Sequence, residues 1–292
     1  MKNASSFFLM LAMVAAVLIA GCAQQQQQGQ PTLQSTPLPT PQPTSIKSAG
    51  TIGTAGSPYG TILVDSRGKT LYTFADDIPN SGMSACSGQC AALWPAISTE
   101  TTKVSSPLIP ADFGSFMRAD GSEQTTYRGR PLYYYQQDTK AGDVKGENFL
   151  NVWFVARTGE RVQVAHREDT GVFLTDSSGK TLYYYTKDTA GTSACTDACI
   201  ARWPAFSVDS VTAPSLLKPA DFSTVTRADG KKQTAYMGRP LYSYAGDAKP
   251  GEVNGQAFGG IWYVANVSGF APGGTVQPTT PNTLSPSGGS SY

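Results

Sequence analysis

The sequence predicts an α+β protein, mostly antiparallel β, with two tandem homologous small domains. Each domain is expected to contain two β-rich half-repeats and one short cysteine-bearing helix. Three observations lead to this prediction: an eleven-residue pattern that occurs four times, a second half that repeats the first, and short β-branched runs separated by Asp/Gly turns. Such spaced self-similarity indicates repeated architecture, and runs of this composition between turn residues indicate strands.

The eleven-residue pattern has the core Gly-[Lys/Arg]-[Thr/Pro]-Leu-Tyr-x-[Phe/Tyr]-x-x-Asp. Its four copies occupy residues 67–77, 128–138, 178–188 and 237–247. Each copy is followed 15 to 17 residues later by a tryptophan, and the chain contains no others. The four tryptophans are Trp94, Trp153, Trp203 and Trp262. Because every tryptophan follows a copy of the pattern, the pattern indicates the architecture of the protein more directly than its activity.

A tandem duplication groups the four copies into pairs. Residues 110–138 and 219–247 are identical at 18 of 29 positions at an offset of 109. The first motif needs an offset of 111, so the loop before the cysteines is two residues shorter in the second copy. We place repeat domain 1 at residues 50–158 and repeat domain 2 at residues 162–268.

A second arrangement is a four-bladed, propeller-like ring, because a propeller blade takes ~40–50 residues. Cysteine pairs occur only in the first and third units, and the motif tyrosines are spaced alternately by 61, 50 and 59 residues. Both observations favour the pairwise organisation.

Within each domain the pattern of apolar residues predicts hairpins and one helix. Residues 61–64 and 70–74 flank an Asp/Gly turn, as do residues 116–118 and 124–127. Residues 132–135 and 153–156 are expected to be further strands. The helix is expected at residues 87–94, with Ser87 as its N-cap and a proline directly after it. The second copy repeats these elements, with Thr196 as the N-cap of its helix.

The two ends of the chain predict export and anchoring. Residues 1–22 read as a lipoprotein signal peptide, with an apolar run of 14 residues that ends in a lipobox at Cys22. Fourteen residues are short of the ~20 that a membrane-spanning helix needs. Residues 23–49 form a disordered Gln/Pro/Thr tether, and residues 271–292 a disordered Pro/Thr/Ser/Gly tail. We therefore expect an extracytoplasmic protein that lipid on Cys22 anchors to the cell membrane, at the cell surface.

The aromatic pair of each motif allows two interpretations. Rings at positions i and i+2 of a strand share one face, so they form a buried core in the first interpretation. The aspartate then fastens the following loop by accepting backbone N–H bonds. In the second interpretation the rings form an exposed shelf for a sugar, polymer or flat cofactor. The candidate ligand-binding residues are Tyr72, Phe74, Asp77, Tyr133, Tyr135, Asp138, Tyr183, Tyr185, Asp188, Tyr242, Tyr244 and Asp247.

The two Cys-x-x-x-Cys pairs are the sharpest chemical signal. Five cysteines less the lipidated one leave Cys86, Cys90, Cys195 and Cys199, and outside the cytoplasm such pairs form disulfides. The alternative is copper binding or thiol redox chemistry completed by a histidine. The chain has one histidine, His166, whose counterpart in the first domain is Ala55, so such a site could exist only once. We therefore predict two structural disulfides and no metal site.

The net charge and the absence of known catalytic motifs argue against several classes of function. Lysine and arginine total 22 against 21 acids, and no basic stripe indicates nucleic-acid binding. The sequence has no phosphate-binding glycine loop, nucleophile elbow or metalloprotease motif. Four similar copies also argue against catalysis, which needs one asymmetric set of residues. We therefore assign no catalytic residues and no cofactor.

The lipobox, the repeated Tyr-x-[Phe/Tyr]-x-x-Asp and the Cys-x-x-x-Cys-x-x-x-Trp-Pro together resemble a family of secreted-repeat lipoproteins of unknown function. The resemblance covers about residues 57–267 and implies a cell-surface location and a tandem β-rich repeat. It implies no activity. The leading hypothesis is a non-enzymatic binding or envelope structural module, with an envelope polymer or surface protein as partner. The alternative is an extracytoplasmic redox or copper-handling protein that uses the cysteine pairs.

Overall fold

A computed structural model describes residues 46–47, 50–98 and 103–270 of the chain. The predicted signal peptide with Cys22, nearly all of the predicted tether and the tail at 271–292 lie outside the described residues. Among the residues that are described, no helix has the length and apolar character to cross a membrane.

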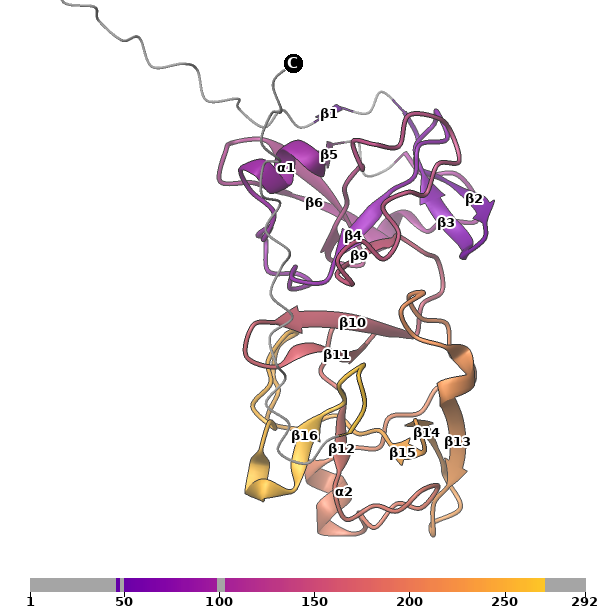
Figure 1. The fold of residues 1–292 in the computed structure, drawn as a ribbon, viewed down its shortest axis with the longest axis vertical. Coiled ribbons are helices and arrows are strands. Elements are labelled where there is room, and N and C mark those ends of the chain that lie inside the picture. Colours follow the sequence, from indigo (N-terminus) through magenta and orange to yellow (C-terminus); the bar gives the residue numbers. More distant parts are fainter. Residues whose placement is uncertain (1–45, 48–49, 99–102, 271–292) are drawn as a thin grey trace, which may run out of the picture. The chain divides into compact units, whose positions relative to one another are not determined.

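The first repeat consists of short strands and one α-helix (Figure 1). Its elements are β1 (Ile46–Lys47), β2 (Gly53–Ser57), β3 (Gly60–Val64), β4 (Tyr72–Phe74), α1 (Gln89–Leu93), β5 (Ile97–Ser98), the 3-10 turn η1 (Pro110–Asp112), β6 (Phe113–Met117), β7 (Glu123–Tyr127), β8 (Arg130–Pro131) and β9 (Trp153–Val155). Apart from the parallel pair β1 and β5, its paired strands are antiparallel.

The second repeat has the same order of elements without counterparts of β1 and β5 and with an additional 3-10 turn, η3. Its elements are β10 (Val162–Arg167), β11 (Gly171–Asp176), β12 (Tyr183–Tyr185), α2 (Ala198–Arg202), η2 (Pro219–Asp221), β13 (Phe222–Thr226), β14 (Lys232–Tyr236), β15 (Arg239–Pro240), η3 (Phe258–Gly260) and β16 (Trp262–Val264). The predicted fold class is thus confirmed: antiparallel strands dominate, and the short helices α1 and α2 carry one cysteine of each pair.

The motif strand of each repeat pairs with the strand that holds the last tryptophan. β4 lies antiparallel to β9, with Phe74 opposite Trp153. β12 lies antiparallel to β16 in the same register, with Tyr185 opposite Trp262. Each described sheet has two or three strands and stays within one repeat. The described strands therefore follow the pairwise organisation and form no four-stranded propeller blade.

Several local predictions hold and others do not. The hairpin predicted around residues 116–127 is confirmed as β6 and β7. Residues 132–135 form no continuous strand, because Tyr133 alone bridges to Tyr72 and Ala96. The N-cap prediction for Ser87 is wrong, since Gly88 precedes the helix with a φ of 55° and no side chain caps it.

The helix of the second repeat differs from its prediction in the same way. Asp197, with a φ of 50°, takes the cap position that we predicted for Thr196. A left-handed residue at this point reverses the chain just before the helix. This reversal leaves the Cα atoms of the following cysteine pair, Cys195 and Cys199, 5.3 Å apart.

Alternation along the motif strands separates two buried clusters in each repeat. Tyr72 and Tyr133 lie in one cluster of the first repeat, whereas Leu71 and Leu132 lie in the other. This alternation is the period of two that a strand imposes on its side chains. All four residues are fully buried. The motif therefore supplies core to both faces of the strand that carries it.

Candidate functional site

The first tyrosine of every motif hydrogen-bonds to the aspartate of the partner motif. In the first repeat, Tyr72 donates to Asp138 Oδ2 across 2.6 Å, and Tyr133 donates to Asp77 Oδ2 across 2.7 Å. The second repeat has the same crossed pairs, which are Tyr183 to Asp247 at 2.6 Å and Tyr242 to Asp188 at 2.7 Å. All eight residues are buried. Each motif therefore completes the hydrogen bonding of the other.

The second carboxylate oxygen of each motif aspartate holds the loop that follows. Asp77 Oδ1 accepts the Ala85 N–H at 2.8 Å, and Asp138 Oδ1 accepts the Lys145 N–H at 3.0 Å. The corresponding bonds of the second repeat join Asp188 to Ala194 N–H at 2.7 Å and Asp247 to Asn254 N–H at 2.9 Å. The prediction that these aspartates fasten the following loop is confirmed.

Burial dominates the electrostatics of these pairs. It raises the pKa of Asp77 to about 6, although the Ala85 N–H and the Tyr133 hydroxyl lower it. Burial also raises the pKa of Asp138. The pKa of Tyr72 is raised for the same reason and because its hydroxyl donates to a carboxylate. A tyrosine held in its neutral form and bonded to a carboxylate is a structural donor, not a ready nucleophile or base.

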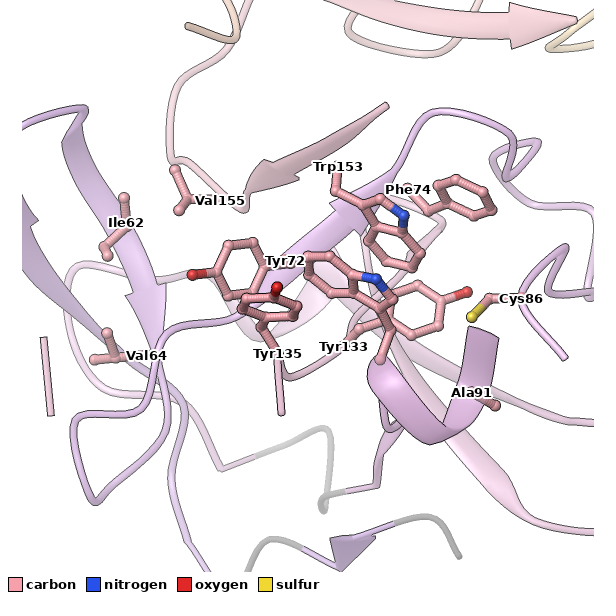
Figure 2. Packing of buried hydrophobic residues seen from close by; sticks show 11 residues of the cluster. Ile62, Val64, Tyr72, Phe74, Cys86, Ala91, Tyr133, Tyr135, Trp153 and Val155 are labelled. Atoms are coloured by element: carbon pink, nitrogen blue, oxygen red, sulfur yellow. The ribbon is translucent and has the colours of Figure 1, made fainter. Parts of the chain in front are cut away.

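Four aromatic rings form a stacked column at the centre of the first repeat. Figure 2 shows Phe74 against Trp153, with Tyr72, Tyr133 and Tyr135 nearby. Phe74 stacks on Trp153 with centroids 4.2 Å apart. Trp153 stacks on Trp94 at 3.9 Å with an interplanar angle of 2°. Trp94 stacks on Tyr135 at 4.3 Å. The two tryptophans thus form the middle of the column and the second rings of the two motifs form its ends.

The second repeat builds the same column from equivalent residues. Tyr185 stacks on Trp262 at 4.3 Å, Trp262 on Trp203 at 3.9 Å, and Trp203 on Tyr244 at 4.4 Å. The order is crossed, because Trp203 follows the third motif in sequence yet contacts the ring of the fourth. Stacked aromatic pairs add ~0.5–1.5 kcal/mol each beyond their buried area. The column therefore joins the two half-repeats as the tyrosine–aspartate bonds do.

A glycine lets the loop after the second motif approach this column. Gly146 donates its N–H to the Tyr72 hydroxyl at 3.3 Å. A Cβ atom at this glycine would lie 2.6 Å from Trp94 Cη2 and 2.9 Å from Tyr72 Cε1. Gly255 occupies the same position against Trp203 and Tyr183. Both glycines are required by close contact with the rings.

The four cysteines form two disulfides, Cys86–Cys90 and Cys195–Cys199. A buried arginine braces each of them, because Arg118 Nη2 donates to Cys86 O at 2.6 Å and Arg227 Nη2 donates to Cys195 O at 2.7 Å. These arginines lie outside the aromatic and cysteine motifs of the sequence. The signal that marks them is their identity at an offset of 109 within the duplicated segment.

The only histidine of the chain lies on β10. His166 Nδ1 is 2.8 Å from Asp76 Oδ1 of the first repeat. In the described part of the chain, no three His, Cys, Asp or Glu side chains are arranged to hold a metal ion.

The twelve candidate ligand-binding residues differ in exposure. Tyr185 and Tyr244 are half-buried, and the other ten are buried. The first tyrosine and the aspartate of each motif already have hydrogen-bond partners inside their repeat. A role for any of the twelve in ligand contact stays a prediction.

The crossed motif pairs and the two equivalent repeats define a tandem-repeat protein in which two motifs form one unit. The model of a family described as a secreted repeat of unknown function matches residues 53–98, 114–157, 164–207 and 223–266. The chain belongs to this family, as the sequence resemblance indicated. Membership places the protein outside the cytoplasm. No curated protein and no solved structure matches the chain.

Proposed function

We propose that the protein is a lipid-anchored surface module that binds an envelope polymer or a surface protein, or contributes to envelope structure, without catalysis. The observation that carries the proposal is the crossed hydrogen bonding of the motifs. Buried polar groups need partners, and here the tyrosine hydroxyls and aspartates partner one another. The repeated residues therefore serve as scaffold, and a partner contacts parts of the surface that differ between the repeats.

Anchoring by lipid on Cys22 is the second part of the proposal, supported by the lipobox at the end of the apolar run. A Cys22→Ala variant of the full chain tests it. We expect the unmodified chain to partition into detergent and to carry a metabolically incorporated fatty-acid label. The variant should lose the label and leave the membrane fraction. A label that persists in the variant would contradict this anchor.

The binding function is separated from the redox alternative by the state of the cysteines. We expect the purified, denatured protein to contain no free thiols and no bound metal, in line with the two disulfides. Four free thiols with copper would instead favour metal handling. Binding itself is tested on an array of envelope polysaccharides and against surface-protein extracts. Failure of both, with normal envelope integrity in a deletion strain, would contradict the proposal.

A further inference from the structure

Two differences between the repeats, one on β10 and one in the loop after the first motif, lie at the same cavity. The cavity has a volume of about 110 Å³ and contains side chains of both repeats. His166 lines it, and the strand register places Gly56 of the first repeat, not the Ala55 expected from sequence, at the equivalent position. Ile78 and Pro79 also line it, and they belong to the loop that is two residues longer in the first repeat. The cavity therefore has residues that the duplicated scaffold does not repeat.

Arg130 is the most unusual residue of this cavity. Its side chain is buried, with 4% of the residue exposed, and its Nε and Nη2 atoms have no hydrogen-bond partner. The equivalent arginine of the second repeat is Arg239, whose Nη1 donates to the carbonyl oxygens of Thr186 and Asp188. A guanidinium offers five N–H donors, and leaving buried donors unpaired is costly. Arg130 thus has the donors that an anionic ligand would use.

The two acids that line the cavity with Arg130 already have hydrogen-bond partners. Asp76 is bonded to His166, and Asp77 accepts from Tyr133 and from a backbone N–H. Glu160 does not line the cavity; it is buried, burial raises its pKa to about 8, and its Oε1 lies 4.0 Å from Arg157 Nε without a hydrogen-bond partner. None of these acids forms an ion pair with Arg130 within 4 Å. The carboxylates that line the cavity are therefore hydrogen-bonded already, whereas the Nε and Nη2 donors of Arg130 are not.

A larger groove of about 500 Å³ shares several wall residues with the cavity, which are Ile78, Pro79, Arg167 and Gly251. Lys249 and Asn254 of the second repeat also line the groove. Arg167, at the boundary between the two spaces, forms a two-bond pair with Asp169. A ligand longer than one charged group would therefore find room beyond the cavity.

We propose that this cavity binds an oxyanion group, a carboxylate or a phosphate, whose parent ligand lies along the groove. The proposal rests on the binding function proposed above and deepens it by naming the ligand chemistry. Guanidinium groups bind both oxyanions through paired N–H donors, so the site alone fits either one. Arg130 would be the anchoring residue, and His166 would report on occupancy because it lines the same cavity.

The single histidine makes the test direct. The full chain, purified in detergent without a histidine tag and labelled with ¹³C-histidine, gives one imidazole signal. Inorganic phosphate and acetate are titrated separately at constant ionic strength. We expect saturable shifts of this signal with at least one of them, and the stronger one identifies the source of the oxyanion. Strictly linear shifts with both anions, equal to those with chloride, would overturn the proposal.

Matched variants assign the effect to Arg130. Arg130→Gln should weaken binding about tenfold or more, the loss expected for one charge-assisted hydrogen bond. Arg239→Gln, the same change at the equivalent position, should leave the affinity unchanged. Equal losses in both variants would overturn the assignment. If Arg130→Gln does not fold, Arg130→Lys serves as the test. Lysine keeps the positive charge but lacks the planar guanidinium, so this variant must bind the anion several times more weakly than the unchanged chain.

The anion titrations and the tests of envelope binding can fail independently of each other. Polysaccharide or surface-protein binding that persists in Arg130→Gln, without any anion effect, would remove the oxyanion site and leave the binding module. Saturable anion binding without any envelope partner would support the oxyanion site and contradict the proposed binding of an envelope partner.

Discussion

Tyr72 donates its hydroxyl hydrogen to Asp138 across 2.6 Å, and these two residues belong to different copies of the same motif. The return bond runs from Tyr133 to Asp77. Two copies of one motif are thus joined because each donates a tyrosine hydroxyl to the aspartate of the other. Neither copy satisfies its hydrogen bonds without the other. The same exchange in the second repeat shows that the arrangement follows from the motif itself.

Loss of one crossed hydroxyl should be costly. Tyr72→Phe leaves Asp138 Oδ2 and the Gly146 N–H without their buried partner. We expect the free energy of unfolding to fall by about 1–3 kcal/mol. Urea unfolding of the full chain measures it, with Tyr263→Phe as control, because that hydroxyl makes an exposed bond. A loss no larger than that of the control would contradict a structural role for the exchange.

The two stacked tryptophan pairs should be visible in the circular dichroism spectrum. Trp94 and Trp153 lie 3.9 Å apart and nearly parallel, as do Trp203 and Trp262. Indoles in this geometry couple excitonically. Trp94→Phe should remove about half of the coupled signal, since one of two aromatic pairs remains. Phe149→Leu, beside Trp94 but outside the column, should leave the coupled signal unchanged.

The disulfides should stabilise the protein without defining its fold. Each closes a loop between cysteines four residues apart, so its entropic contribution is only about 2 kcal/mol. We expect Cys86→Ala/Cys90→Ala to lose about this much and to keep the aromatic signal described above. Unfolding of the first repeat on loss of the pair would show that the aromatic column is insufficient by itself.

Gly146 should tolerate no side chain. Gly146→Ala places a methyl group against the rings of Trp94 and Tyr72, and overpacking of this kind costs about 1–3 kcal/mol. Gly56→Ala is the control, because an added Cβ there meets nothing within 4 Å. Thermal unfolding of the two variants should therefore differ clearly. Similar midpoints would mean that the loop at Gly146 moves aside without cost.

Glu160 should give the protein a pH-dependent stability. Burial raises its pKa in the fold to about 8, above the ordinary value of 4.5 for a glutamate, so the folded state binds this proton more tightly than the unfolded chain. The free energy of unfolding should therefore fall as the pH rises towards 8. Asp77 acts in the same direction but titrates near pH 6. Between pH 6.5 and 8, urea unfolding reports on Glu160 together with His166, whose pKa is raised by its hydrogen bond to Asp76 and which acts in the same direction.

Glu160→Gln should reduce this dependence to the part that His166 contributes, because the amide cannot ionise. Glu123→Gln, a change at an exposed position, should retain the slope of the unchanged chain. Parallel slopes in the Glu160 variant and the unchanged chain would show that Glu160 is ionised in the fold.

The sequence predicts the local features of this fold well and the crossed contacts poorly. Periodicity locates the hairpin of β6 and β7, and the spacing of the cysteines indicates their disulfides. The partner of Tyr72 is not readable in this way, because Asp77 in its own motif is as good an acceptor as Asp138. The choice depends on how two strands 61 residues apart meet, and no local pattern contains that information. The N-cap at Gly88 escaped prediction because a left-handed turn replaces side-chain capping.

The exchange between motifs also limits how such a protein can grow. One motif alone presents a tyrosine and an aspartate that find their partners only in a second copy. A chain that gained or lost a single copy would carry one unmatched half, open to the matching half of another molecule. Proteins of this type should therefore change length two motifs at a time, and an odd-numbered chain should be found as a dimer.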